Sequence, residues 1–186
     1  MNHTYVHQGA NPDMARKLVV NAKMRRVSVC GATETLLIDK AVAPSLLPLI
    51  AADLKAKGCE LRGGETARSI VPDMVAATDE DWSTEYLAPV ITVGVVNDLD
   101  HAIAHIETYG SGHTEAIVTD DAHAAATFLN AVDSAIVVHN ASTQYADGGE
   151  FGFGGEIGIA TGRMHARGPV GAEQLTTYKY LVRGHG

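Results

Sequence analysis

The strongest constraint on the fold is a regular alternation of short apolar runs and amphipathic stretches along residues 4–139. Val90–Val96 is the clearest apolar run, and Leu99–Tyr109 follows it as a helical pattern behind the capping residue Asp98. Because short loops join strand to helix to strand, these segments predict parallel βαβ units. We therefore expect an α/β fold with a mostly parallel sheet and flanking helices.

The same patterns predict the other elements. Further strands are expected at Thr4–His7, Thr35–Ile38, Glu115–Val118 and Ala135–His139, with a short one opening at Cys59, and further helices at Pro12–Lys23, Ser45–Lys57 and Asp121–Leu129. From Asn140 to Gly171 glycine and polar residues dominate, and a loop of this length in a compact domain is usually functional. The β-rich tail Leu175–Val182 predicts a terminal strand.

Composition narrows the class of protein. The 186 residues suffice for one domain with a real core, and the net charge of −8 argues against a nucleic-acid binder, which needs clustered Lys and Arg. No apolar run could span a membrane, and residues 1–14 do not resemble a secretory signal, so a cytoplasmic location is expected. His101 and His105 lack the Glu of a zinc motif; we favour a solvated helix face there and predict no metal site.

Two cysteines are the candidate nucleophiles. Cys30 lies between a helix and a buried strand, where Arg25 and Arg26 would favour its reactive thiolate form. The alternative is a buried structural cysteine, and the local sequence alone favours that alternative. Cys59 is expected to be structural. The run Gly148–Gly158 lacks the spacing of a dinucleotide-binding or Walker loop, but its backbone amides remain candidates for holding an anion.

Three segments resemble the γ-glutamyl phosphate reductase family. They are NAKMRRVSVCGATETLLID, NDLDHAIAHIETYGSGHTEAIVT and HNASTQYADGGEFGFGGEIGIATGRMHARGPVGAEQLTTYKY. The resemblance runs from about Thr4 to Arg183, and HARGP followed by TTYKY makes its last segment highly specific. It implies an aldehyde dehydrogenase fold and identifies Cys30 as the nucleophile.

The resemblance also implies a domain organisation. Residues 1–171 would form the catalytic domain, and residues 172–186 an oligomerisation strand and tail. Family members are more than twice as long, so their N-terminal dinucleotide-binding domain is expected to lie outside this sequence. The chain alone is therefore expected to be inactive as a reductase.

The reaction that the resemblance implies is the NADPH-dependent reduction of L-glutamyl 5-phosphate to L-glutamate 5-semialdehyde, with release of phosphate, in proline biosynthesis. Cys30 would form a thioester with the substrate. Glu85 would hold the nicotinamide ribose, although a solvated loop glutamate explains it equally well. The candidate substrate-binding residues are Asn140, Ser142, Thr143 and Arg167.

Several alternatives stay open. Arg167 and His165 could instead hold the glycine-rich loop against Asp147 or Glu156, and for His165 we favour this structural role. The chain could also be a non-catalytic oligomerisation or interaction module of the same fold. A different aldehyde dehydrogenase relative is a third possibility, against which the HARGP and TTYKY segments argue. The implied partners are L-glutamyl 5-phosphate, further copies of the chain, and glutamate 5-kinase as a candidate.

Two residues beside the nucleophile depart from the family pattern. Val27 stands where the family commonly has Pro, and Gly31 where it commonly has Asn. Gly31 removes a side-chain hydrogen-bonding group and loosens the backbone. The fine geometry of the oxyanion site is therefore expected to differ.

Overall fold

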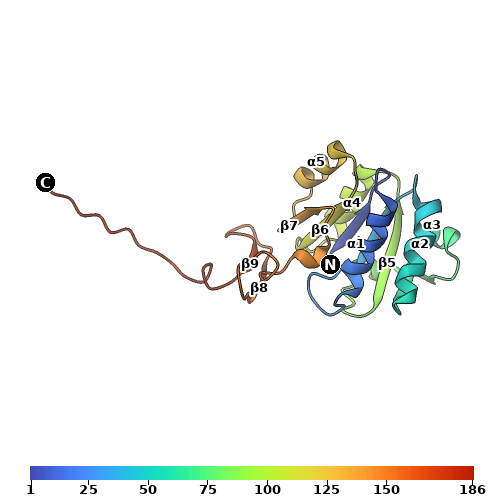
Figure 1. The fold of residues 1–186 in the computed structure, drawn as a ribbon, viewed down its shortest axis with the longest axis horizontal. Helices are drawn as coiled ribbons and strands as arrows, with labels where there is room; N and C mark the ends of the chain where they lie inside the picture. Colours follow the sequence, from blue (N-terminus) through green and yellow to red (C-terminus); the bar gives the residue numbers. More distant parts are fainter.

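The computed structural model describes residues 1–186 and contains a seven-stranded sheet with helices on both faces (Figure 1). The strands are β1 (His3–Val6), β2 (Thr35–Asp39), β3 (Glu60–Gly63), β4 (Val75–Ala76), β5 (Val90–Val96), β6 (Thr114–Val118) and β7 (Ile136–His139). Their order is β4-β3-β5-β2-β1-β6-β7, and every neighbouring pair is parallel. The predicted α/β fold with a parallel sheet is confirmed.

The helices are α1 (Pro12–Met24), α2 (Ala43–Ala56), α3 (Glu65–Ile70), α4 (Leu99–Tyr109) and α5 (Ala122–Ala131), with 3₁₀ turns η1 (Asp79–Ser83) and η2 (Thr143–Tyr145). Three of the five helices, α1, α4 and α5, begin behind a side-chain cap. Asp98 and Asp121 cap α4 and α5 by accepting from first-turn amides. The glycine after α2, Gly58, has a φ of 81° and fills the left-handed position that ends many helices. None of the helices has the length and apolarity that crossing a membrane requires.

The sheet is buried on both faces, which explains why its strands are apolar runs. On one face, Val6 and Leu36 belong to a cluster of 19 buried residues packed with α1, α2 and α3. On the other face, Tyr5 and Leu37 belong to a cluster of nine packed with α4 and α5. Packing on both faces fixes the ends of the strands and therefore positions the loops attached to those ends.

The helix α4 differs from the sequence expectation in one respect. His101 is exposed, as a solvated face requires, but His105 packs its ring against Trp82 and Tyr109 with centroids 5.3 and 4.7 Å away. Burial lowers the pKa of His105 to about 4. The solvated-face prediction was therefore wrong for His105, which is a packing residue.

The C-terminal segment is organised differently from the sheet. It contains one small antiparallel pair, β8 (Gly158–Ala160) with β9 (Gly168–Val170), and then extends away from the body (Figure 1). The terminal strand predicted at Leu175–Val182 is not formed in the single chain. A strand needs a neighbour to complete its hydrogen-bond ladder, and none lies beside this tail. Its pairing with a second copy stays a prediction.

Candidate active site

Cys30 lies in the turn between α1 and β2, at the amino ends of β1 and β2. The residue before β1, Asn2, donates its side-chain N–H to the backbone oxygens of Cys30 at 2.7 Å and Ala32 at 3.3 Å. The backbone oxygen of Asn2 accepts from the amides of Glu34 and Thr35. The turn is therefore fastened to the amino edge of the sheet.

Cys30 is exposed and lines a pocket of about 310 Å³ between the end of α1 and the segment after η2. The residues that line this pocket are Arg25, Arg26, Val29, Cys30, Gly31, Gln144, Ala146, Asp147, Gly149, Glu150 and Glu156. The buried structural interpretation of Cys30 is thus wrong. Cys59, in contrast, is 4% exposed within the apolar core, as predicted, and burial raises its pKa to about 11.

The electrostatic environment disfavours the thiolate of Cys30. Although the residue is exposed, its sulfur is partly desolvated in the pocket, which raises the pKa of the thiol, and the carboxylates of Glu156 and Glu85 raise it further. The backbone amides of Cys30 and Gly31 act in the opposite direction, because they donate toward the sulfur. In this chain the thiol is therefore less ionised at neutral pH than a free cysteine.

The neighbouring arginines do not reverse this effect. Arg25 donates to Glu150 at 2.5 Å, and the ion pair neutralises the charge that would have favoured the thiolate. Arg26 lines the pocket but is not among the groups that shift the Cys30 pKa. The geometry therefore does not support activation of Cys30 by the two arginines.

Glu85 lies in the segment between η1 and β5, at the amino end of β5, which neighbours β2. Its side chain is exposed and makes no hydrogen bond within the chain, so both carboxylate oxygens are free to accept. Its charge acts on the Cys30 thiol. The structure brings Glu85 to the same edge of the sheet as Cys30, and the ribose-binding role stays a prediction.

Asn140 follows β7 with a φ of 52°, in the left-handed region that asparagine tolerates better than most residues. Its side-chain oxygen accepts from the amide of Thr119 and its nitrogen donates to the oxygen of Thr119, both at 2.9 Å. This pair of bonds joins the ends of β6 and β7. The groups expected to bind substrate are thus already engaged by the backbone.

Thr143 opens the turn η2, which packs beside the Cys30 turn, and Ser142 directly precedes it. Ser142 caps η2 by accepting from the amide of Gln144 at 3.2 Å, and the buried Thr143 hydroxyl lies 2.9 Å from that of Thr33. A Cβ on Gly31 would approach the oxygen of Thr143 to 3.2 Å. Neither Ser142 nor Thr143 lines the pocket, and their substrate-binding role stays a prediction.

Arg167 and His165 do not hold the loop in the way considered above. The Arg167 guanidinium donates to the side chain and backbone oxygen of Asp133, at 2.5 and 2.9 Å, rather than to Asp147 or Glu156. His165 is exposed and makes no hydrogen bond, so the structural role favoured for it is not observed. Contact of Arg167 with substrate stays a prediction.

Sequence reasoning missed Gln144, which positions the end of α1. Its buried side-chain nitrogen donates to the backbone oxygens of Asn21, Ala22 and Arg26, at 3.2, 2.9 and 3.1 Å. The first two oxygens belong to the last turns of α1, and that of Arg26 to the segment that leads from α1 to Cys30. No local pattern could have revealed this role, because the partners are more than a hundred residues away in the chain.

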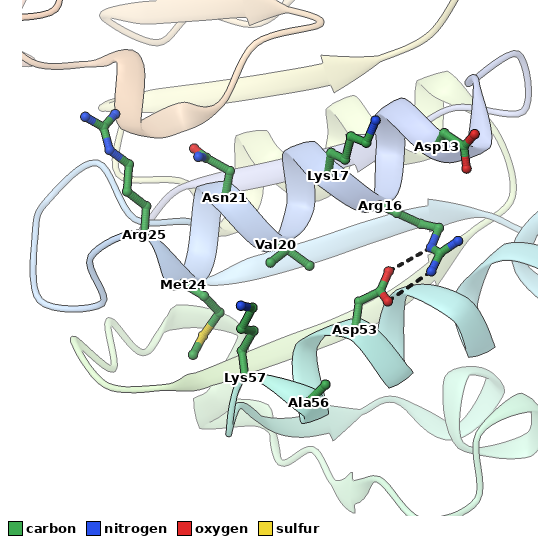
Figure 2. A pocket seen from close by; sticks show the side chains of 10 residues that line it. All are labelled: Asp13, Arg16, Lys17, Val20, Asn21, Met24, Arg25, Asp53, Ala56 and Lys57. Carbon is green, nitrogen blue, oxygen red and sulfur yellow. Dashed lines mark hydrogen bonds and ion pairs between the residues drawn. The ribbon is translucent and has the colours of Figure 1, made fainter.

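A larger groove, of about 720 Å³, lies between α1 and α2 (Figure 2). Arg16 reaches across it and binds Asp53 through two hydrogen bonds of 2.7 and 3.0 Å. The groove holds no cysteine, histidine or serine. The pocket of Cys30 is smaller, but it contains the only exposed nucleophilic thiol and is therefore the candidate active site.

Comparisons with known proteins identify the family to which this fold belongs. The model of the aldehyde dehydrogenase family matches residues 5–181. Over all 186 residues the chain is 64% identical to a γ-glutamyl phosphate reductase of Caulobacter sp. (strain K31) and spans 44% of that protein's length. The crystal structure of γ-glutamyl phosphate reductase from Thermotoga maritima superimposes with a TM-score of 0.95 at 47% identity, covering 99% of this chain and 44% of that one. The corresponding structure from Saccharomyces cerevisiae gives 0.64 at 27% identity, covering 81% of this chain and 38% of that one.

The parallel sheet with its flanking helices is thus the fold of a known class of enzymes. The chain belongs to the aldehyde dehydrogenase family. Within that family it is similar to γ-glutamyl phosphate reductases over its whole length, while it spans less than half the length of the relatives it matches.

Proposed function

We propose that the chain supplies the nucleophile of a cytoplasmic enzyme that reduces L-glutamyl 5-phosphate to L-glutamate 5-semialdehyde in proline biosynthesis. The observation that carries the proposal is the exposed Cys30 in a pocket at the amino edge of the sheet, beside Glu85, in a chain 64% identical to a γ-glutamyl phosphate reductase. Glutamate 5-kinase is a candidate partner, because the proposed substrate is an acyl phosphate of glutamate, which is the product that such a kinase would form.

In the first step the Cys30 thiolate attacks the acyl carbon of the substrate. A carbon–sulfur bond forms, the carbon–oxygen bond to the phosphoryl group breaks, and phosphate leaves. A thiolate suits this step because it is both a strong nucleophile and, later, a good leaving group. The amides of Cys30 and Gly31, which donate toward the sulfur, are candidates to stabilise the oxyanion.

The second step needs a nicotinamide cofactor, as in other members of the family, and we propose NADPH. Glu85 fits such a group, because its carboxylate is exposed, makes no hydrogen bond within the chain and lies at the same edge as Cys30. When bound, the cofactor supplies a hydride to the thioester carbon. Breaking the carbon–sulfur bond then releases the aldehyde and returns the thiolate of Cys30.

The substrate must be held by its charged groups. The pocket of Cys30 presents the guanidinium of Arg26 together with the carboxylates of Asp147 and Glu156, which suits an amino acid with both an ammonium and a carboxylate. Asn140, Ser142, Thr143 and Arg167 remain proposed substrate-binding residues. Their present intramolecular bonds mean that binding would require them to exchange partners.

A non-catalytic oligomerisation module is the alternative, favoured by two observations. The Cys30 pKa is raised rather than lowered, and the tail exposes Tyr178 and Val182 at 79% and 91%. A shared assay separates the two functions. Freshly made glutamyl phosphate is added to this chain, alone and joined to the N-terminal part of the Caulobacter relative, while phosphate release and NADPH oxidation are both followed.

The proposal expects slow phosphate release from the chain alone and NADPH oxidation only in the joined form. Positioning two reactants can lower a reaction barrier by about 7–11 kcal/mol. This chain has no dinucleotide fingerprint that would position the cofactor in that way. Loss of phosphate release on Cys30→Ser, in both forms, is also expected. No Cys30-dependent phosphate release in either form would favour the non-catalytic module.

A further inference from the structure

A buried ion pair connects the segment of the nucleophile with that of Glu85. The Lys23 ammonium donates to Glu34 at 2.6 Å, and the two side chains are 0% and 1% exposed. Lys23 comes from the last turn of α1, before Cys30, and Glu34 follows Cys30 directly ahead of β2. A buried pair of this kind adds little net stability compared with apolar residues, so its presence calls for another explanation.

The second oxygen of Glu34 reaches the Glu85 segment. It accepts from the amide of Leu87 at 3.4 Å. The ammonium of Lys23 lies 5.9 Å from the centre of the Tyr86 ring. Burial raises the pKa of Glu34, while Lys23 opposes that rise. The amides of Leu87 and Tyr86 both act to lower the pKa of Glu34 as well. The Glu34 carboxylate thus contacts both α1, which leads to Cys30, and the segment of Glu85.

The residue that Glu34 holds has an unusual backbone. Leu87 has a φ of 50°, in the left-handed region that leucine rarely adopts, although its side chain is 46% exposed. Such a conformation persists only where surrounding contacts impose it, and it clusters at functional sites. The amide of Leu87, two residues after Glu85, is the group that donates to Glu34 from this conformation.

The side chain of Tyr86 holds the same segment against the sheet. Its hydroxyl lies 2.7 Å from both the Asp81 carboxylate and the Thr92 hydroxyl of β5. In addition, the amide of Thr92 donates to the backbone oxygen of Glu34. The Glu85 segment is therefore held to the sheet on one side and to Glu34 on the other.

We infer that Lys23 and Glu34 are positioning residues, which fix the Glu85 segment relative to Cys30 so that a ribose held by Glu85 places its nicotinamide at the Cys30 thioester. This inference rests on the proposed function for its consequence in catalysis. The geometric part, that Glu34 imposes the Glu85 segment's conformation through the Leu87 amide, can be tested on the chain by itself.

The test compares two double variants of the chain. Lys23→Met/Glu34→Gln removes both charges but keeps an oxygen that can accept from the Leu87 amide. Lys23→Met/Glu34→Leu removes the charges and that acceptor. Replacing a buried ion pair by apolar groups is often neutral for stability, so both variants should fold. Arg16→Met/Asp53→Leu, which removes the exposed ion pair between α1 and α2, is the control (Figure 2).

The measurement is amide hydrogen exchange of residues 84–88, followed by mass spectrometry. The leucine variant should exchange there roughly ten-fold faster than the parent, with β2 and β5 unchanged, because local opening is set by local contacts. The glutamine variant and the control should match the parent. Equal exchange in the glutamine and leucine variants, whether slow or fast, would overturn the inference. If the leucine variant fails to fold, Lys23→Met/Glu34→Met takes its place with the same expectations.

A second measurement tests the consequence for catalysis in the chain joined to the N-terminal part of the Caulobacter relative. The leucine variant should lose on the order of 10²-fold in steady-state NADPH oxidation, the cost of a small misplacement. The first-turnover burst of Cys30-dependent phosphate release, measured without NADPH, should stay within about three-fold of the parent. Rescue by the glutamine variant is expected. If the joined parent itself oxidises no NADPH, the proposed function fails, and the exchange result alone then decides the geometric inference.

Discussion

The sheet body, residues 1–147, and the C-terminal segment, residues 148–186, differ in how they bury their side chains. In the body, two clusters fill both faces of the sheet, and residues such as Leu47 and Phe128 are 0% exposed. After Ala146 no residue that carries a side chain is buried, and Ile157 and Met164 are 76% and 92% exposed. The body is therefore stabilised by its own contacts, whereas the segment leaves apolar side chains exposed in the single chain.

This difference also separates the two halves of the candidate site. The turn of Cys30 and the segment of Glu85 belong to the body and are fixed by buried groups. Glu156, which acts on the Cys30 thiol, belongs to the C-terminal segment. The nucleophile is thus placed by a rigid sheet, while its charge environment depends on a segment held by few contacts.

The largest expected contrast concerns stability. Leu47→Ala creates a cavity in the core between the sheet and α2 and should lower the free energy of unfolding by about 2–5 kcal/mol. Leu181→Ala, at a residue 73% exposed in the tail, should change it by less than about 0.5 kcal/mol. Urea unfolding measures both. Similar losses in the two variants would show that the tail contributes to the core.

The next contrast concerns assembly. Removing residues 171–186 should convert an oligomer of the chain to monomer or aggregate, because the tail carries Leu175, Tyr178 and Leu181 as exposed apolar groups without a partner. The unfolding midpoint of the body should stay unchanged, since the tail makes no strand with it. Light scattering reports the mass, and an unchanged oligomer would contradict the predicted intersubunit strand.

A smaller contrast concerns the two thiols. Iodoacetamide should label Cys30 at least about ten-fold faster than Cys59 at pH 7.5, because Cys30 is exposed and Cys59 is buried with a pKa of about 11. Since the Cys30 pKa is raised, its rate should climb close to ten-fold per pH unit through neutrality, with no plateau below about 8.5. Peptide mass spectrometry assigns the labels, and a plateau near pH 7 would mean that the arginines do activate Cys30.

The smallest effect is expected from Glu156. Glu156→Gln removes a carboxylate that raises the Cys30 pKa, so the pKa should fall and labelling at pH 7.5 should accelerate by a few-fold. Glu107→Gln is the matched control, because Glu107 is an exposed carboxylate on α4 that does not act on the Cys30 thiol. Equal acceleration in both variants would show a general effect of net charge rather than a local one.

Much of the body could be predicted from sequence, and the reasons are local. The strand Val90–Val96 and the helix Leu99–Tyr109 match the prediction residue for residue, because an apolar run and the Asp98 cap define their ends. The helix α3 was missed, since it is short and is held by the packing of Ala67 and Val71 rather than by a periodic pattern. The tail strand was predicted from composition, but the single chain offers it no partner.

The candidate site was only partly predictable for the same reason. Cys30 and Glu85 lie in segments that a family resemblance identifies. Glu34 and Gln144 act through backbone groups 53 and 122 residues away in the chain, at Leu87 and Ala22, and no local pattern carries such pairings. The raised pKa of Cys30 likewise depends on Glu156, which the fold brings to the pocket.

The central claim is that Cys30 is the group that accepts the glutamyl moiety. The direct measurement is peptide mass spectrometry of the chain after mixing with freshly made glutamyl phosphate and acid quenching, which preserves thioesters. We expect a glutamyl adduct on Cys30, present in Cys59→Ser and absent in Cys30→Ser. An adduct on Cys59, or an adduct that persists in Cys30→Ser, would contradict it.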